Sequence, residues 1–192
     1  MTRSKEFDER EVLLKAMHLF WEKGYEKTSL QDLVTHMGIH RRSLYDTFGD
    51  KHSLFVKTIE EYQKQVRAII NSEVRRGRTA KQVIRFKFDY LIEVNDDRPL
   101  GCLIVNSATE LALRDPEICE MTNASFSNEE KILVDLIQKG QQSGEIPLDK
   151  DAKILAASVQ TTMIGLRVLA RTSADKKRMH QIADASIAML DA

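Results

Sequence analysis

Apolar residues recur every three or four positions along most of this sequence, and that spacing constrains the fold more than any other feature. Between Asp8 and Lys23, for example, Val12, Ala16 and Phe20 fall on one face of a helix. Only 3 prolines and 8 glycines interrupt the 192 residues. β-Sandwiches and barrels need many turns, so the spacing and the sparse turn residues together predict an all-α protein.

Glycines and capping residues divide this pattern into nine predicted helices. Gly24, Gly38 and Gly49 each stand just beyond the end of a short helix, as glycine commonly does. The predicted helices cover residues 8–23, 28–37, 39–48, 51–76, 79–94, 102–113, 116–142, 150–171 and 174–190. The three short helices indicate one domain at residues 1–50, and the longer helices indicate a second at residues 51–192.

The second and third helices form a helix-turn-helix pattern around Gly38. In such a motif the second helix of the pair enters the major groove of DNA, and its N-terminal residues meet the bases. Leu44 and Phe48 mark the buried side of this helix. Its exposed end then carries groups that bind bases and phosphates, namely His40, Arg41, Arg42, Ser43 and Tyr45.

Two further residues stand where helices begin, and free backbone N–H groups at such places attract phosphate. Lys51 opens the fourth helix, and Thr28 opens the second. Thr28 and Gln31 have the spacing of a capping box, and Ser29 with Asp32 offers a weaker version. We therefore expect Lys51 and Thr28 to contribute to a phosphate-binding surface.

The charge balance requires any DNA-binding surface to be local. Lys plus Arg and Asp plus Glu both total 29, whereas nucleic-acid-binding proteins are often basic. Asp46 points outward beside the arginines and repels phosphate, although its carboxylate can accept from the amino group of a cytosine. Taken alone, Arg41 and Arg42 fit an ordinary solvated helix face equally well.

The stretch TSLQDLVTHMGIHRRSLYDTFGDKHSLF resembles the DNA-binding domain of the tetracycline-repressor (TetR/AcrR) family of bacterial transcriptional regulators. The resemblance covers about residues 8–57 and implies a three-helix DNA-binding domain followed by a larger helical ligand-binding and dimerisation domain. It implies phosphate or backbone contacts by Thr28, Ser43, Tyr45 and Lys51, and base contacts by Gln31, Arg41 and Arg42. His40 departs from the family, in which a serine often caps this helix.

The resemblance also implies partners for the protein. The expected function is that of a repressor that binds double-stranded DNA at a palindromic operator as a homodimer and is released by a small-molecule effector. The candidate residues for the dimer interface are Leu155, Val159, Leu166, Met179, Ala183 and Ile187. The candidate residues for the ligand pocket are Phe86, Tyr90, Asn106, Glu110, Phe126 and Met163. Packing inside one subunit is the alternative for both sets, and no pattern specifies the ligand.

The other residue patterns argue against catalysis, metal binding and export. Cys102 and Cys119 form no CxxC pair, and no phosphate-binding glycine loop or GxSxG motif occurs. The histidines lack the spacing of metal ligands or of a nucleophile's partner; they are His18, His36, His40, His52 and His180. No long apolar run predicts a membrane span, and the charged N-terminus leads into no apolar signal core. We expect a cytoplasmic, non-enzymatic protein without a cofactor.

Two other functions remain open from the sequence. A redox-controlled regulator would use Cys102 or Cys119 as its sensor. A helical protein that binds a small molecule but not DNA would agree with the zero net charge and with Asp46.

Overall fold

The computed structural model describes residues 7–93, 98–172 and 175–191, and every regular element within these ranges is an α-helix. The described helices are α1 (Glu9–Lys23), α2 (Leu30–Met37), α3 (Arg41–Phe48), α4 (Lys51–Arg75), α5 (Ala80–Ile92), α6 (Leu103–Leu111), α7 (Pro116–Gln142), α8 (Ala152–Leu169) and α9 (Lys176–Ala188). This arrangement confirms the predicted all-α fold, in which three short helices precede a larger helical part.

Most helix bounds follow the predictions closely. α7 spans Pro116–Gln142, as predicted, because the Asp115 side chain caps it and a proline occupies its first turn. The predicted end of the fifth helix at Val94 and the predicted start of the ninth at Ala174 lie outside the described residues.

α2 begins with the second of the two predicted capping boxes, the one between Ser29 and Asp32. The Ser29 hydroxyl accepts from the Asp32 N–H, and the Asp32 carboxylate accepts from the Ser29 N–H. The Ser29 hydroxyl also donates to the Asp32 carboxylate at 2.6 Å, and this bond, together with the one from the Ser29 N–H, lowers the pKa of Asp32 to about 2. Thr28 is fully buried, and its hydroxyl donates to the Gly24 carbonyl at 2.6 Å. The predicted pairing of Thr28 with Gln31 is therefore wrong, because the preceding turn already uses the Thr28 hydroxyl.

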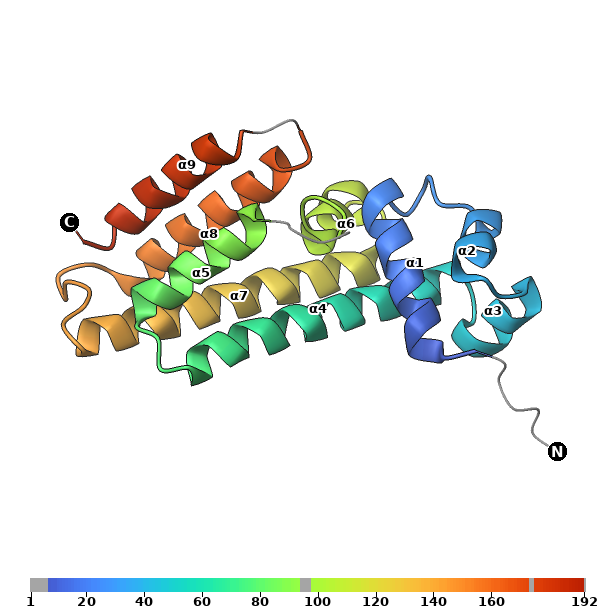
Figure 1. Ribbon diagram of the computed structural model, residues 1–192, viewed down its shortest axis with the longest axis horizontal. Coiled ribbons are helices and arrows are strands. Elements are labelled where there is room, and N and C mark those ends of the chain that lie inside the picture. Colours follow the sequence, from blue (N-terminus) through green and yellow to red (C-terminus); the bar gives the residue numbers. More distant parts are fainter. Residues whose placement is uncertain (1–6, 94–97, 173–174, 192) are drawn as a thin grey trace.

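The helix-turn-helix unit lies at one tip of the elongated molecule. Figure 1 shows α1, α2 and α3 at this end, with α4 running from them toward the opposite end. At the opposite end α5 packs against α9, and α7 packs against both α5 and α8. α2 and α3 are consequently the helices that the molecule can present most readily to an extended partner.

Two apolar cores hold the helices together. The first joins α1, α2, α3 and the start of α4 to α6, with Phe20, Phe55 and Leu103 among its members. The rings of Phe20 and Phe55 meet edge to face, with their centres 4.9 Å apart. The second core joins α5, α7, α8 and α9 around residues such as Phe88 and Ile137. The domain division at residue 50 remains a prediction, and the first core extends across it.

The residues predicted to form a dimer interface belong mainly to the second core. The buried ones, each at most 8% exposed, are Leu155, Val159, Leu166, Met179 and Ala183. Ile187 is half-buried and packs against the same core. Leu155, Val159 and Leu166 of α8 and Met179 and Ala183 of α9 thus face the core of their own subunit rather than its surface, whereas a dimer contact by the half-buried Ile187 remains a prediction.

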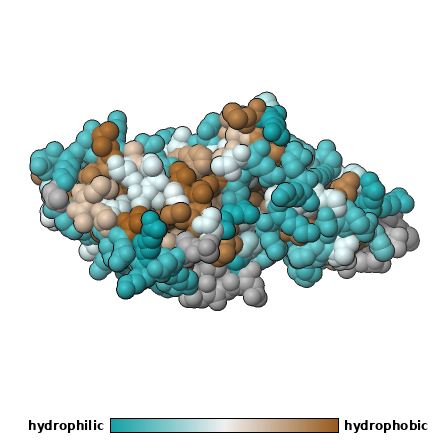
Figure 2. Space-filling view, turned by 90° about the horizontal axis from the view of Figure 1, so that it is seen from above, coloured by the Kyte–Doolittle hydropathy of each residue, from teal (hydrophilic) through white to brown (hydrophobic). Residues whose placement is uncertain are grey.

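The other side of α8 is exposed and also apolar. The exposed fractions of Ile154, Val168 and Leu169 are 66%, 49% and 42%. In Figure 2, brown and pale residues gather toward the end of the molecule that holds α8 and α9, whereas the opposite end is mostly teal. An apolar outer face on a helix usually marks an interaction surface.

The turn that follows α1 is held by side chains from the second half of the chain. The Glu110 carboxylate of α6 accepts from the backbone N–H groups of Tyr25 and Glu26 at 3.0 and 2.8 Å. Gly24 allows this approach, because its φ is +84° and a Cβ there would lie 2.9 Å from a Glu110 oxygen.

The carbonyl groups at the end of α1 are bound in a similar way. Arg171, just beyond α8, donates to the Trp21 and Glu22 carbonyls at 3.4 and 3.2 Å. Asn106 of α6 donates to the Trp21 carbonyl at 3.5 Å. We call Asn106, Glu110 and Arg171 the turn clamp, since together they bind the end of α1 and the first part of the α1–α2 turn.

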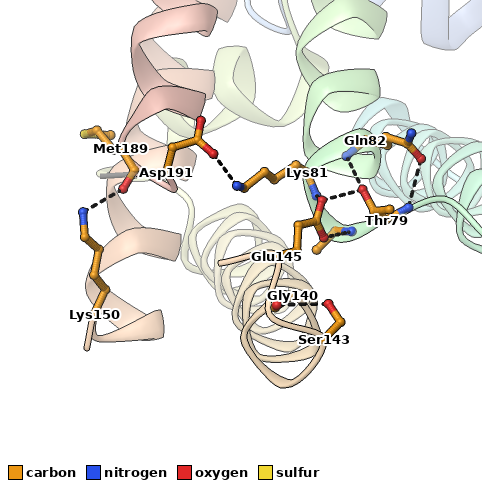
Figure 3. Close-up of polar contacts among 10 residues, drawn as sticks. Thr79, Lys81, Gln82, Gly140, Ser143, Glu145, Lys150, Met189 and Asp191 are labelled. Carbon is orange, nitrogen blue, oxygen red and sulfur yellow. Dashed lines mark hydrogen bonds and ion pairs between the residues drawn. The ribbon is translucent and has the colours of Figure 1, made fainter. Parts of the chain in front are cut away.

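A second carboxylate binds a helix start at the opposite end of the molecule. Figure 3 shows Glu145, in the loop after α7, accepting from the Thr79 hydroxyl and from the N–H groups of Ala80 and Lys81. The Lys81 ammonium also pairs with Asp191, beyond α9. The start of α5 is thereby fastened to both the α7–α8 loop and the C-terminal end.

We expect Glu110→Ala to lower the free energy of unfolding by about 1.5–3 kcal/mol, because two backbone donors lose a charged acceptor. Urea denaturation followed by circular dichroism measures this change. Glu120→Ala is the matched control, because Glu120 is exposed on α7, and surface changes of this kind usually stay within about 0.5 kcal/mol. Equal stability of the two variants would contradict the role of Glu110.

Candidate nucleic-acid interface and ligand cavity

The turn between α2 and α3 gives the predicted helix-turn-helix its geometry. Gly38 adopts a left-handed conformation with φ +70° and ψ +32°, which glycine reaches without strain. His40 is the N-cap residue of α3, but its side chain makes no capping hydrogen bond. The first turn of α3 therefore begins with backbone N–H groups that no capping side chain covers, directly beside Arg41 and Arg42.

Two pairs of side chains, each one helical turn apart, form the exposed face of α3. Arg41 donates to the Tyr45 hydroxyl at 3.4 Å, and its guanidinium lies 5.8 Å from the centre of the Tyr45 ring. Arg42 approaches Asp46 at 3.6 Å, with side chains 92% and 70% exposed. Such an exposed pair contributes little to stability. Both arginines are therefore available to an incoming partner at low cost.

The remaining predicted contacts differ in accessibility. His40 is exposed, and Ser43 is half-buried on α3. Gln31 is exposed at the start of α2, where its side-chain amide donates to the Thr35 hydroxyl at 3.2 Å. Sequence reasoning missed Thr35, which is exposed one turn beyond Gln31. Thr35 follows Gln31 by one helical turn, and this spacing could have indicated that the two side chains lie on the same exposed face of α2.

Lys51 and Thr28, the two residues predicted at helix starts, lie differently. The Lys51 ammonium is 4.2 Å from the centre of the Tyr25 ring, a cation–π contact. Burial lowers the pKa of Lys51, while Glu26 and Glu110 partly raise it. The Thr28 hydroxyl is buried and bonded to a backbone carbonyl. A phosphate contact by the Thr28 side chain is therefore incompatible with this conformation.

A cavity of about 300 Å³ lies between α4, α6, α7 and α8. Its lining is apolar over much of its surface, with contributions from Val66, Ile104, Phe126, Met163 and Ile164. Polar and charged side chains complete it, among them Tyr62, Gln63, Gln160, Glu129 and Arg167. A largely apolar cavity with a few converging polar groups is typical of a small-molecule site.

The six predicted ligand residues separate into three groups. Phe126 and Met163 line the cavity, and Tyr90 lines a small neighbouring cavity of about 30 Å³. Asn106 and Glu110 point instead toward the end of α1, where they form part of the turn clamp. Phe86 stacks on Tyr90, with ring centres 6.1 Å apart, and lies outside both cavities. Phe86, Asn106 and Glu110 therefore do not line the cavity, contrary to the expectation that they would surround the ligand.

Both cysteines are free thiols. Cys102 lines the cavity but is only 2% exposed, and the Tyr62 hydroxyl donates to its sulfur at 3.3 Å. Cys119 is half-buried on α7. Within the described parts of the chain, no three His, Cys, Asp or Glu residues gather to hold a metal ion.

Two family models match this chain. One, described as bacterial regulatory proteins of the tetR family, matches residues 12–58. The other, described as the tetracyclin repressor-like C-terminal domain, matches residues 84–186. The chain belongs to the tetR family. The first match contains the whole helix-turn-helix unit, and the second contains α6, α7 and α8, three of the four helices around the cavity.

Two named relatives span nearly the whole chain. YezE of Bacillus subtilis (strain 168), an uncharacterized HTH-type transcriptional regulator, is 34% identical and covers 100% of both chains. ComR of Escherichia coli (strain K12), an HTH-type transcriptional repressor, is 31% identical, covering 96% of this chain and 90% of ComR. These relatives are transcriptional regulators rather than enzymes.

Solved structures agree with this assignment. Two structures of cysteine mutants of the TetR family transcriptional regulator CifR, each complexed with 26-bp double-strand operator DNA, are 24% and 25% identical to this chain. They superpose with TM-scores of 0.89 and 0.84, covering 98% and 97% of this chain and 99% and 98% of theirs. This tetR-family protein is accordingly a DNA-binding transcriptional regulator with a helix-turn-helix domain.

If Arg42 reads a base, Arg42→Ala should weaken binding to the operator by about 1–3 kcal/mol and leave binding to random DNA nearly unchanged. Lys51→Ala is the contrasting variant. It should weaken binding to both DNAs alike and lower the slope of log K against log salt by about one. Fluorescence anisotropy at several salt concentrations measures both effects, and an equal loss on the two DNAs for Arg42→Ala would exclude base reading.

Asp46→Asn should raise the affinity for random duplex DNA by about two- to fivefold, because it removes an exposed carboxylate that pairs with Arg42 and repels phosphate. Anisotropy titrations at low salt measure this. Asp135→Asn is the control, because it removes one exposed negative charge on α7. A loss of affinity confined to the operator would instead assign Asp46 to base reading.

Proposed function

We propose that the protein is a homodimeric transcriptional repressor of the cytoplasm that binds a palindromic operator and is released by a small molecule. The arrangement of α3 is the observation that carries the proposal. Arg41, Arg42 and Tyr45 occupy the exposed face at the tip of the molecule, where a helix can enter a major groove. His40, Ser43 and Gln31 complete the proposed DNA-binding surface, and Lys51 extends it to the start of α4.

Dimerisation is supported by the exposed face of α8. By length and composition α8 could cross a membrane, with a mean hydropathy of 1.2, although core helices of soluble proteins meet the same criterion. One side of α8 is buried in the second core, and the other exposes Ile154, Thr161 and Val168 at intervals of seven residues. A helix that is apolar on both sides is normally buried on both. We propose that this second side, the α8 outer face, packs against the second subunit.

Gly165 lies on the α8 outer face between Thr161 and Val168 and supports the same arrangement. It is exposed, and a Cβ there would meet no atom of its own chain within 4 Å. Glycine inside a helix costs about 1 kcal/mol relative to alanine, and this subunit gives no packing reason for it. A helix of the second subunit approaching closely at Gly165 supplies that reason.

Gly165→Arg should therefore convert the dimer to a monomer, because the α8 outer face would acquire both bulk and charge. Sedimentation velocity measures the change in mass, and circular dichroism checks that the helices remain. Gln138→Arg is the control, since Gln138 is exposed on α7. A Gly165→Arg protein that sediments like wild type would contradict this interface.

Release by ligand follows from the position of the cavity. α6 lines the cavity through Cys102 and Ile104 and carries Asn106 and Glu110 of the turn clamp. A ligand that binds one arrangement of α6 better than another changes the position of the α1–α2 turn and thus of α3. Two α3 helices in a dimer must stand about 34–36 Å apart to reach successive major grooves, so small rotations weaken operator binding.

The experiment that tests this function is selection of bound sequences from a random duplex pool with the purified protein. A recovered palindrome is the expected result, and its affinity should fall linearly on a log–log plot as salt rises. Absence of enrichment at low salt would favour the alternative, a helical small-molecule-binding protein without DNA binding.

A redox-controlled regulator remains the second candidate. Cys102 lines the cavity, but its 2% exposure restricts access by an oxidant, and reactive cysteines are usually accessible. Cys119, half-buried beside Asn123, lies outside the cavity. Peroxide treatment distinguishes the two candidates, because only redox control predicts that oxidation of the purified protein changes operator affinity.

A further inference from the structure

Arg167 brings a positive charge to the cavity, and no described side chain forms an ion pair with it. It lies on α8, is half-buried, and lines both the large cavity and the small neighbouring one. Among the described residues it makes no hydrogen bond or ion pair through its guanidinium. Burial by itself lowers the pKa of Arg167. The electrostatic effect of nearby groups is larger and raises this pKa; the groups are Cys102, Tyr62 and then Glu129. The guanidinium therefore stays charged.

The carboxylate in the cavity lining already has a partner. Glu129 of α7 pairs with the ammonium of Lys87 on α5 at 2.8 Å, and the two side chains are 21% and 5% exposed. A second arginine, Arg67 of α4, lines the cavity and is exposed to solvent. The lining thus sets two arginines, Arg67 and Arg167, against a single carboxylate, Glu129, which Lys87 also shares, so positive charge is in excess.

An unpaired charge in such a place is costly to the protein alone. Removing a guanidinium from water without a counter-charge destabilises the folded state, and an anion that binds there recovers part of that cost. The planar guanidinium presents parallel N–H donors that match the two oxygens of a carboxylate. The cavity thus favours a ligand that brings its own negative charge.

The rest of the cavity sets the size and character of the ligand. At about 300 Å³ it is at the lower end of the range for small-molecule sites. Phe126, Met163 and Ile164 give it apolar walls. A single aromatic ring or a short alkyl chain fits such walls, whereas a large polycyclic compound does not.

We propose that the cavity binds a small organic carboxylate, with the carboxylate on Arg167 and an apolar group against Phe126 and Met163. This inference rests on the proposed function insofar as it treats the cavity as the effector site. It adds the chemical class of the effector and the residue that selects it.

The test compares matched acids and amides on the purified protein in the absence of DNA. Benzoate and 3-phenylpropanoate are each titrated against benzamide and 3-phenylpropanamide. The sequence contains 1 tryptophan, Trp21, and its ring meets the ring of the cavity residue Tyr62 at 4.9 Å between centres. Tryptophan fluorescence therefore reports binding, and isothermal calorimetry provides an independent measurement.

We expect at least one acid to bind at least about tenfold more tightly than its amide, because only the acid can make a charge-assisted hydrogen bond. Arg167→Met should abolish this preference, and Arg167→Lys should retain part of it because a positive charge remains. Arg114→Gln is the control, because it removes one positive charge, as Arg167→Met does, from a residue that is exposed and does not line the cavity. Equal binding of acids and amides, or no binding of either acid, would overturn the proposal.

The stability of the variants gives a second readout. In the absence of ligand, Arg167→Met should melt at a higher temperature than wild type, because a half-buried charge without an ion pair is replaced by an apolar side chain. The acid that binds should raise the melting temperature of wild type but not of Arg167→Met. A lower melting temperature of unliganded Arg167→Met would mean that Arg167 serves the fold, and would overturn the proposal.

Operator binding is measured separately, so the two proposals can fail independently. An acid that binds through Arg167 without changing operator affinity supports the ligand class and contradicts ligand release. A protein that binds its selected operator but shows no preference for acids retains the proposed DNA function and loses this inference.

Discussion

The position of the helix-turn-helix depends on hydrogen bonds that the end of α1 cannot make for itself. The backbone groups of Trp21, Glu22, Tyr25 and Glu26 bind side chains that follow them by 84 to 150 residues in the sequence. Backbone groups that are shielded from water need partners, and for the part-buried groups of Tyr25 and Trp21 these partners come from α6 and from the end of α8. The α1–α2 turn therefore takes its position from the larger helical part, and α2 and α3 follow that turn directly.

The same helices that hold this turn also enclose the cavity. Arg167, which lines the cavity, precedes Arg171 of the turn clamp by one helical turn. Tyr62 lines the cavity on one side and meets Trp21 of α1 on the other. Two short paths thus join the cavity to the end of α1, one through α8 and one through the Tyr62 ring. Packed side chains of this kind transmit small shifts because they cannot be compressed.

Sequence reasoning succeeded where local rules decide the structure and failed where tertiary packing decides it. Helix bounds such as Pro116–Gln142 follow from a capping aspartate, a proline and apolar spacing. The spacing also placed Asn106 and Glu110 on one face of α6, but it could not reveal that this face meets α1 rather than the cavity. Both faces of α8 are apolar, and a periodic pattern does not say which of them holds the core. Arg167 stands alone in an apolar helix, so nothing in the sequence marked it as a cavity residue.

The composition of the first apolar core affects whether a truncated chain can fold. Leu103 and Leu111 of α6 are buried with residues of α1, α3 and α4, so the DNA-binding helices complete their interior with a segment from the other half of the chain. A fragment that ends after α4 would expose apolar surface and lose the acceptor for two backbone N–H groups at the α1–α2 turn. We expect such a fragment to be less stable than the full chain and more exposed to proteolysis. A truncated product would then not persist as a DNA-binding protein that lacks the larger helical part.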